Sequence, residues 1–428
     1  MPGYRAPQEA GSTIGRRFAI IGATISGNKG AEAMLRAAVH HLSELAPGTS
    51  FYVLSVYPAE DRRLNRDPRL EIVPCKPLPL AFIVIPLCCL HRLLAALHLP
   101  RGWLRRAPAV RALLDADLVV DVAGISFSDG RGVIVLYNAA MILPALLLER
   151  KLLKAAQALG PFRTPMNRWL ARRCLPRVSA IVARGAITQS HLRDLGLGDV
   201  PVCADVAFAM PVDSEAAASA DSLCQDTFFH SHLIGVSPST VVERYCAKRG
   251  IDYTAIMAGF VDHVTETYGA NVVIFAHAAR PGGAKSRTND LPTCGRVYQG
   301  VRAKDRCRFL DVALSAGELR HIIGKTRFFL ASRFHAMISG LAMGVPTLLV
   351  GWSHKYLEVL DMFELGEWQM DYSALSLEKL AARFARLVES EQEIRARIEA
   401  HLPDVLASSR RNWQLAANLL GEPTEAAR

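Results

Sequence analysis

The sequence predicts an α/β protein built from two doubly wound domains that face each other across a cleft. Two successive sets of short apolar segments alternate with stretches of helical periodicity, which is typical of parallel sheets covered by helices. Between the two sets lies the small, polar and acidic stretch 211–222, whose composition is typical of a linker. The chain of 428 residues is also longer than the roughly 250–300 residues that a single core supports.

These observations divide the chain into five parts. We expect a tail at 1–16, a first domain at 17–210, a linker at 211–230, a second domain at 231–400, and a C-terminal helix with a tail at 401–428. Helical periodicity near the C-terminus predicts helices over Leu377–Ala400 and Arg411–Leu420.

Composition narrows the class of protein. Apolar residues make up 50% and charged residues 21% of the chain, as in ordinary globular proteins. The nine cysteines form no C-x-x-C pair, and no metal-binding motif is present, so we predict no disulfide framework, no metal and no cofactor. The N-terminus lacks the apolar segment of a secretory signal, which predicts a cytoplasmic location. The formal charge of +10 indicates an anionic partner, but dispersed basic residues and few aromatic ones disfavour nucleic acid.

The first domain opens with a strand, a glycine-containing turn and a helix. The turn holds Gly27, Asn28 and Gly30 without the spacing of a dinucleotide or Walker motif. Asn28 is a helix cap in one interpretation, and the turn faces a phosphate in the other. The elements predicted in this domain are strands over Arg17–Ala23, Phe51–Val56, Asp117–Ala123 and Ser179–Ala183 and helices over Ala31–Leu45, Val133–Leu148 and Ile187–Leu195.

An unusually apolar segment, Leu78–Leu99, interrupts this series. Its uncharged part is shorter than the ~20 residues of a membrane span, and Pro79 and Pro86 are expected to break it. Several arginines follow closely, and no acidic residue occurs before Asp115; the arginines are Arg101, Arg105, Arg106 and Arg111. The segment therefore either lies at an anionic membrane interface or packs as a helix between layers with the arginines in solvent.

The second domain has its chemistry at one strand-to-helix turn. Phe328–Ala331 is a strand, Ser332 is the expected helix N-cap, Gly344 ends the helix, and Pro346–Val350 is the next strand. The other predicted elements are strands over Leu233–Ser237, Asn271–Ala276 and Arg308–Leu310 and helices over Tyr253–Tyr268, Leu291–Gly300 and Ala316–Ile323.

The turn places Arg333 and His335 at a helix N-terminus, where backbone N–H groups and the helix dipole favour an anion such as phosphate. Lys355 and Glu358 follow the next strand, so they lie at the sheet edge where ligands bind in open α/β sheets. The plain alternative is a structural βαβ unit with a surface arginine and a hydrogen-bonded histidine.

Two further polar residues are expected at the same edge. His277 follows the strand Asn271–Ala276, and Asp290 opens the next helix. Asp290 is an N-cap, and His277 a structural or surface histidine, in the plain interpretation.

These residues resemble a known family, the polysaccharide pyruvyl transferases. The match consists of Ser332-Arg333-Phe334-His335-Ala336, then Leu341-Ala342-Met343-Gly344-Val345-Pro346, then Lys355, with fainter features from about Ala19 to Leu365. The resemblance implies two Rossmann-like domains in a glycosyltransferase-B-like arrangement, with a last helix that crosses back to the first domain. It also implies that the Gly27–Gly30 turn closes over the substrate cleft.

The sequence departs from the family in two places. Consecutive glycines are usual where this chain keeps only Gly124 and Gly130, and Arg-Asp is common where it has Arg184-Gly185. The arginine faces the donor in the family, so we expect Arg184 to do so here without its acidic neighbour.

The resemblance implies transfer of a pyruvyl group from phosphoenolpyruvate to two hydroxyls of a sugar in a polysaccharide or glycolipid precursor. The product is a cyclic ketal. Arg333, Arg184 and Lys355 are expected to hold the donor's charges, and His335, or second His277, to supply the proton. Asp290 and Glu358 are both candidates for the base.

Two other functions stay open. One is a two-domain glycosyltransferase that uses a sugar nucleotide, and the other is a non-catalytic glycan-binding relative. The acceptor sugar is soluble in one alternative and lipid-linked in the other. For a lipid-linked acceptor we expect the enzyme at the inner face of the plasma membrane.

Overall fold

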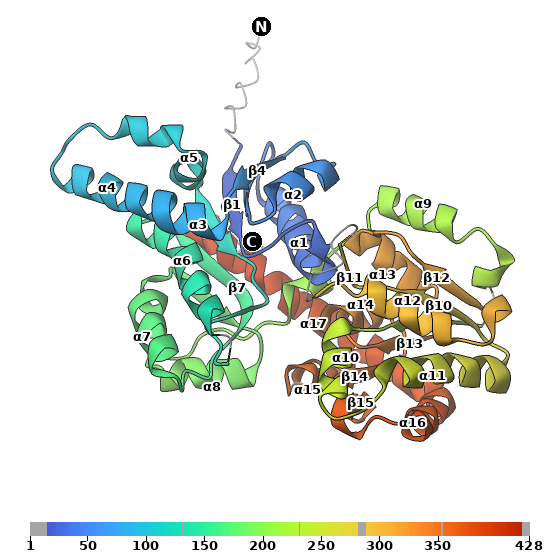
Figure 1. Ribbon diagram of the computed structural model, residues 1–428. Coiled ribbons are helices and arrows are strands. Elements are labelled where there is room, and N and C mark those ends of the chain that lie inside the picture. Colours follow the sequence, from blue (N-terminus) through green and yellow to red (C-terminus); the bar gives the residue numbers. More distant parts are fainter. Residues whose placement is uncertain (1–14, 131, 231, 281–287, 352–353, 422–428) are drawn as a thin grey trace, which may run out of the picture.

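Two parallel sheets with helices on both faces form two domains in the computed structural model, which describes residues 15–130, 132–230, 232–280, 288–351 and 354–421 (Figure 1). The first sheet has the order β4-β3-β1-β5-β7, with β6 and β8 both paired to β7. The second has the order β12-β10-β9-β13-β14-β15. The predicted class, two Rossmann-like α/β domains, is confirmed.

The strands of the first sheet are β1 (Arg17–Ile21), β3 (Ser50–Ser55), β4 (Leu70–Pro74), β5 (Leu118–Asp121), β6 (Ile125–Ser126), β7 (Leu152–Leu159) and β8 (Ala180–Ala183). Those of the second are β9 (Leu233–Ser237), β10 (Asn271–Phe275), β12 (Cys307–Leu310), β13 (Phe328–Ala331), β14 (Thr347–Gly351) and β15 (Gln369–Asp371). Strands β5, β9, β13 and β14 are buried along their whole length. This explains their nearly continuous apolar sequences, since helices cover both faces of a parallel sheet.

The helices of the first domain are α1 (Lys29–Leu45), α2 (Pro58–Leu64), α3 (Pro77–Pro79), α4 (Ile85–Ala96), α5 (Pro108–Asp115), α6 (Val133–Leu147), α7 (Pro165–Cys174) and α8 (Ala186–Asp194). Those that follow are α9 (Ser214–Leu223), α10 (Thr240–Ala247), α11 (Tyr253–Tyr268), α12 (Leu291–Gly300), α13 (Ala316–Gly324), α14 (Phe334–Ala342), α15 (His354–Asp361), α16 (Leu377–Glu389) and α17 (Glu391–Leu420). Every helix predicted from periodicity in the first 350 residues is present.

Three details differ from the predictions. The stretch 211–230 contains α9, capped by Asp213 and packed on α13, because its alanines favour a helix as much as a linker. The C-terminal helix begins at Glu391 and continues through Pro403, so no break separates 400 from 411. Residues 1–14 of the predicted tail and 422–428 lie outside the described residues.

The segment predicted to be broken by prolines is a continuous helix over Pro77–Ala96. Pro79 lies in its first turn, where no intrahelical N–H bond is lost, and a short π-helical stretch η1 (Leu80–Val84) precedes Pro86. Only 17% of its most apolar stretch of 18 residues is buried. The interpretation in which this helix packs between layers of the domain is therefore wrong.

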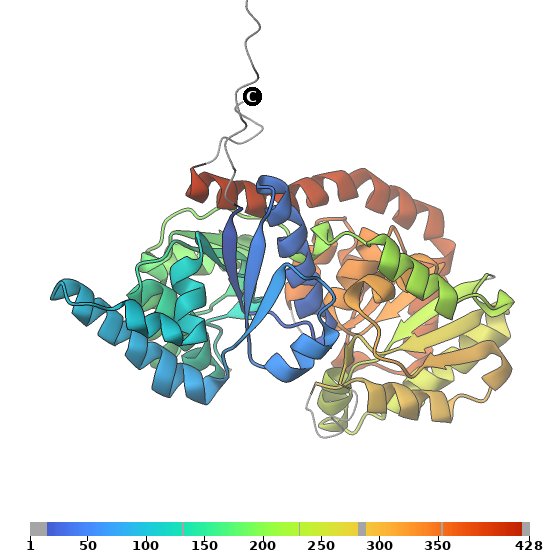
Figure 2. The same ribbon diagram turned by 90° about the horizontal axis from the view of Figure 1, so that it is seen from above.

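Helix α17 and a small sheet both join the domains. Figure 2 shows α17 running across both of them, as the family resemblance implied. Its Asn412 Oδ1 accepts the N–H of Ala156 in β7 at 2.8 Å. On the other side, β2 (Gly27–Asn28) and β11 (Ala278–Ala279) form a two-stranded antiparallel sheet, with Asn28 opposite Ala278. The glycine turn of the first domain is therefore held directly against the second.

Candidate active site

The turn between β13 and α14 lies at the point where the strand order of the second sheet reverses, next to β9. Ligands of doubly wound sheets bind at such points. The far end of α14 is fixed by Gly344, which has φ +70° and donates to Leu341 O, while Val345 N donates to Gly340 O at 2.9 Å. This is the Schellman pattern that the sequence predicted.

The start of α14 differs from the prediction. Arg333, not Ser332, occupies the N-cap position, and its side chain makes no cap bond. The Ser332 hydroxyl instead accepts from the buried Tyr253 hydroxyl at 2.9 Å. The first N–H groups of α14 thus receive no side-chain cap from Arg333.

Arg333 is held by a bidentate ion pair with Asp290. Arg333 Nε lies 2.9 Å from Asp290 Oδ2 and Nη2 lies 2.6 Å from Oδ1. The carboxylate is fully buried, whereas 20% of the Arg333 side chain is exposed. Burial raises the pKa of Asp290, and the Arg333 charge opposes that rise.

Asp290 is badly placed to act as a base. Besides Arg333, its Oδ1 accepts the N–H of Thr240 and its Oδ2 the N–H of Ala278. It also stands at the N-cap position of α12 without making a cap bond. Since both oxygens are engaged, the geometry argues against the predicted proton transfer and for a role in orienting Arg333.

His335 lies between the two domains with a free ring nitrogen. Its Nε2 is 3.7 Å from Asp205 Oδ2, too far for a hydrogen bond, and 14% of the side chain is exposed. Burial lowers the pKa of His335, while the Asp205 charge opposes this. The ring packs against Gly30 of α1, where a Cβ atom would overlap it.

Arg184 shares the same carboxylate. Its Nη1 donates to Asp205 Oδ2 at 2.7 Å, and its guanidinium lies 4.5 Å from the centre of the Phe334 ring. An added Cβ at Gly124 would lie 3.4 Å from this Nη1, an ordinary contact, so the approach of the arginine does not require the glycine. Burial would raise the pKa of Asp205, but His335 and Arg184 hold it well below its usual range.

Two buried nitrogen atoms of this group have no hydrogen-bond partner within the described parts of the chain. They are His335 Nε2 and Arg184 Nη2. Buried polar atoms are normally hydrogen-bonded, so two such unpaired nitrogen atoms at one place indicate an anionic ligand.

Asp205 and Phe334 were not predicted as site residues. Asp205 was visible as the single charge in the apolar run Pro201–Ala209. Phe334 was hidden within the Arg-x-His motif, and its ring also lies 5.1 Å from Lys355 Nζ. The ring therefore gathers two of the predicted donor-binding cations.

Glu358 reaches across to the first domain. Its Oε1 accepts the N–H of Ile187 at 3.1 Å, in the first turn of α8. It also fills the space beside Gly185, where an added Cβ would lie 2.5 Å from Oε1. Burial raises the pKa of Glu358. A carboxylate from the other domain thus stands where the acid after Arg184 is missing.

His277 is buried rather than on the surface. Burial and then the nearby positive charges of His335 and Arg333 place its pKa well below the usual value. A neutral imidazole cannot donate the proton that this chemistry needs, which disfavours His277 as the acid.

The glycine turn caps α1, as one of its two interpretations predicted. Asn28 Oδ1 accepts the Gly30 N–H at 3.1 Å and caps α1. Gly27 has φ +79°, and the Arg280 side chain lies where its Cβ would be. The Lys29 N–H donates to His277 O at 3.3 Å, so the capped turn also closes on the second domain.

A family model described as polysaccharide pyruvyl transferase matches residues 28–354, well over half of the chain. The chain belongs to the polysaccharide pyruvyl transferase family. The match includes the Gly27–Gly30 turn from Asn28 onward and the whole Arg333–His335 turn. No curated protein matches the chain.

Solved structures show the same fold at low sequence identity. S. aureus MnaA with UDP has a TM-score of 0.59 at 14% identity and covers 96% of this chain and 99% of that one. A UDP-N-acetylglucosamine 2-epimerase from Listeria monocytogenes, described as putative in its own structure, has 0.58 at 13%, covering 96% and 98%. A transferase from Siraitia grosvenorii with UDP has 0.54 at 13%, covering 95% and 100%. This pyruvyl transferase family member therefore has the two-domain fold of glycosyltransferase-B-like proteins.

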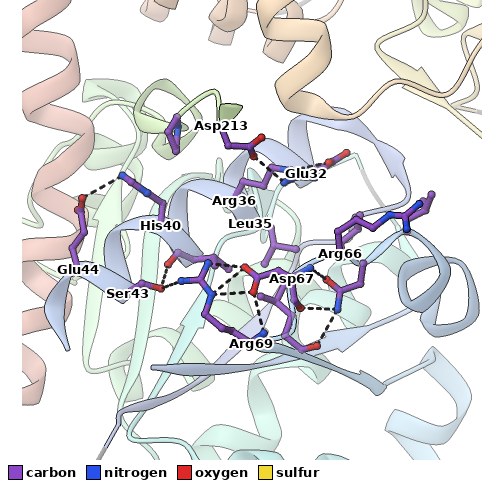
Figure 3. Close-up of a pocket in the computed structure, with 16 residues that line it drawn as sticks. Glu32, Leu35, Arg36, His40, Ser43, Glu44, Arg66, Asp67, Arg69 and Asp213 are labelled. Carbon is purple, nitrogen blue, oxygen red and sulfur yellow. Dashed lines mark hydrogen bonds and ion pairs between the residues drawn. The ribbon is translucent and has the colours of Figure 1, made fainter. Parts of the chain in front are cut away.

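A cavity of about 340 Å³ lies on the other face of α1 (Figure 3). Its lining includes Glu32, Arg36 and His40, which at 100° per residue lie away from Gly30 on the helix. The side chains drawn there pair with one another, as Arg36 does with Glu32 at 2.8 Å. The cavity is thus separate from the Arg333–His335 site.

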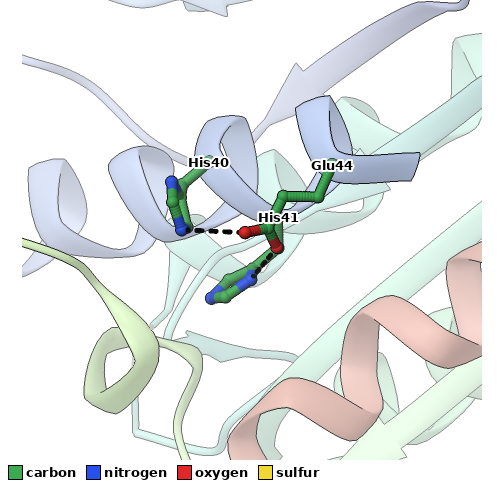
Figure 4. Close-up of side chains that lie close together, drawn as sticks. All are labelled: His40, His41 and Glu44. Carbon is green, nitrogen blue, oxygen red and sulfur yellow. Dashed lines mark hydrogen bonds and ion pairs between the residues drawn. The ribbon is translucent and has the colours of Figure 1, made fainter. Parts of the chain in front are cut away.

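His40, His41 and Glu44 form a cluster at the end of α1, with ligand atoms within 4.8 Å of one another (Figure 4). Both ring nitrogens of His41 already face oxygens, Glu44 Oε2 at 2.8 Å and Ala209 O at 3.0 Å. We therefore interpret the cluster as a hydrogen-bonded link between α1 and the segment after β8.

Proposed function

We propose that this family member transfers the pyruvyl group of phosphoenolpyruvate to two hydroxyls of a sugar, forming a cyclic ketal. The observation that carries the proposal is a pair of buried nitrogen atoms at the domain interface, His335 Nε2 and Arg184 Nη2, that have no hydrogen-bond partner in the described residues. Phosphoenolpyruvate carries a phosphate and a carboxylate, and fixed cations meet both charges.

The cations have distinct tasks in this proposal. Arg184 and Lys355, gathered around Phe334, hold one anionic group of the donor. Arg333, oriented by Asp290, presents its exposed edge to the other. Because Gly30 lies against the His335 ring, the donor enters when the domains separate at β2 and β11.

His335 supplies the proton. The bound donor's negative charge raises the pKa of the imidazole, which then protonates the methylene carbon and makes it a methyl group. One sugar hydroxyl adds to the resulting electrophilic carbon, and the second displaces the phosphate. Of the two hydroxyl protons, one restores His335 and the other leaves with phosphate, so the reaction balances without a metal or cofactor.

Glu358 is the carboxylate candidate for the base that is left from the predicted set. Its Oε1 accepts the N–H of Ile187, and its Oε2 has no hydrogen bond among the described residues. The proposal places the enzyme in the cytoplasm, with a sugar acceptor of a polysaccharide or glycolipid precursor.

A sugar-nucleotide glycosyltransferase is the second candidate, favoured by fold neighbours whose structures contain UDP. In that case the Arg184–Arg333 pair would hold a diphosphate. The two candidates make opposite predictions about the donor.

The deciding experiment offers phosphoenolpyruvate and a panel of UDP-sugars separately, each with a panel of sugar acceptors. We expect phosphate release from phosphoenolpyruvate and its loss in Arg333→Ala and His335→Ala, each assayed at a temperature where circular dichroism shows the variant to be folded. Consumption of UDP-sugars alone would overturn the proposal.

A further inference from the structure

The helix over Pro77–Ala96, made of α3, η1 and α4, stands out from the edge of the first domain (Figures 1 and 2). Its most apolar stretch of 18 residues has a mean hydropathy of 2.0, yet only 17% of that stretch is buried. A surface helix normally carries polar residues on its solvent side. This one needs a different explanation.

Both faces of the helix are apolar. Leu80, Val84 and Cys88, four residues apart, face the domain and are buried. The opposite stripe is exposed and equally apolar, and Leu78 and Phe82 are 71% and 75% exposed. Farther along the same stripe lie Cys89, Leu93 and Leu97, all exposed.

Neighbouring elements enlarge this surface. Helix α6 packs on η1 and α4, and its first residues Val133 and Ile134 are exposed. Trp103, in the turn that follows α4, is exposed as well. Exposed apolar side chains gathered on these neighbouring elements indicate a binding surface.

Positive charge borders the apolar area. No acidic residue occurs between Glu71 and Asp115. A cavity of about 640 Å³ at the end of α4 is lined by His91, Arg92, Arg101, Arg105 and Arg150, with Glu149 as its acidic residue. Arg92 pairs with Glu149 and Arg105 with Asp115, whereas no pairing is described for Arg101 or Arg106 in the parts of the chain that the structure covers.

We propose that residues 77–106, the α3–α4 arm, bind the surface of an anionic phospholipid membrane. The apolar stripe enters the interface, and the arginines at its end meet lipid phosphates. The arm lies in the plane of one leaflet. It does not span the bilayer, because β4 before it and β5 after it belong to one sheet, which a span of ~30 Å would pull apart.

This orientation also concerns the site, a consequence that rests on the proposed function. The arm begins just after the carboxyl end of β4, and α6 begins beyond that of β6. The carboxyl edge of this sheet faces the second domain, because β2, which follows β1, pairs there with β11. The membrane would therefore lie beside the edge that carries the candidate site, which suits a sugar carried on a lipid.

Vesicle flotation tests the proposal. We expect the protein to float with vesicles of phosphatidylcholine mixed with phosphatidylglycerol, and far less with phosphatidylcholine alone. Phe82→Ser with Leu93→Ser should weaken binding about tenfold or more. Arg101→Gln with Arg106→Gln should weaken it about fivefold for each arginine, and high salt should do the same.

Matched controls lie in the second domain. Val312→Ser with Leu377→Ser removes two exposed apolar side chains, and Lys248→Gln with Arg249→Gln removes two exposed charges. Both should float like wild type, and all variants should unfold at the same temperature.

Three results would overturn the proposal: no flotation of the wild type, equal flotation of arm and control variants, or a lipid-free dimer in sedimentation that Phe82→Ser with Leu93→Ser dissociates. Flotation needs no donor or acceptor. Its failure is therefore distinguishable from failure of the transferase proposal, which is measured with soluble acceptors.

Discussion

Gly30 of the first domain lies directly against the imidazole of His335 in the second. The contact joins the first turn of α1 to the first turn of α14, far apart in the sequence. It leaves no space for even one methyl group at position 30. The candidate acid is therefore positioned by both domains, and its environment depends on how closely they meet.

Gly30→Ala should separate folding from activity. Alanine is the better helix former, so α1 itself should not be weakened. The added methyl group would push His335 out of place, and we expect a loss of phosphoenolpyruvate turnover of about 100-fold, since misplacement by 1 Å is that costly. Phosphate release and thermal unfolding measure the two effects.

Gly295→Ala in α12 is the control, because an added Cβ there would meet only the Phe309 ring at 3.8 Å. It should leave turnover unchanged. Wild-type turnover in Gly30→Ala would show that the contact does not position the acid.

Arg333→Lys should damage both stability and donor binding. An ammonium group cannot keep both contacts to the buried Asp290. Losing one charge-assisted hydrogen bond should cost about 2 kcal/mol in the free energy of unfolding, measured in urea. Calorimetric titration with phosphoenolpyruvate should show weaker binding than in wild type.

Arg302→Lys is matched to it, because Arg302 also pairs with an aspartate, Asp262, at 3.0 Å. The Arg302 side chain is largely exposed, so its substitution should lower the free energy of unfolding much less than that of Arg333. Equal effects of the two substitutions, or unchanged donor binding in Arg333→Lys, would contradict the assigned role of Arg333.

Asp205→Asn should move the pH profile of turnover. The Asp205 charge raises the pKa of His335 against the lowering effect of burial. Removing that charge lowers the pKa, so the protonated imidazole is lost at lower pH. The alkaline limb of kcat/KM for phosphoenolpyruvate should therefore shift to lower pH.

Asp221→Asn offers the comparison, since Asp221 lies 2.8 Å from His321 on the surface. The pH profile of turnover in the Asp221→Asn variant should match that of the wild type. An alkaline limb of Asp205→Asn that coincides with the wild-type limb would remove His335 as the group that titrates there.

The sequence predicted the elements better than the site. Phe328–Ala331 was predicted to the residue because a buried parallel strand is a continuous apolar run, and Gly344 and Pro346 mark the turn that follows the next helix. His335 and Arg184 do lie at the interface, whereas the described partners of Arg333 all belong to the second domain. The roles of Asp290, Asp205 and Glu358 were out of reach, because each depends on a partner brought near only by folding.

The prediction that prolines break the segment over 77–96 was wrong for a different reason. Proline was expected to break it, but Pro79 stands in the first turn, and Pro86 follows a π-helical stretch that no sequence pattern announced. Its exposure was equally invisible, since apolar periodicity does not distinguish a buried helix from one that meets a membrane.

Gly185→Asp should destabilise the protein even though the family commonly has an acid at this position. Gly185 has φ +140°, a region that costs other residues about 2 kcal/mol. The new carboxylate would also meet that of Glu358, which already caps α8. Glu358→Ala alone should remove this cap and lower the free energy of unfolding by about 1 kcal/mol. In the double variant the charge repulsion is absent, so its loss of unfolding free energy in urea should be smaller than the sum of the single losses. Strict additivity would mean that Glu358 does not occupy the place of the missing acid.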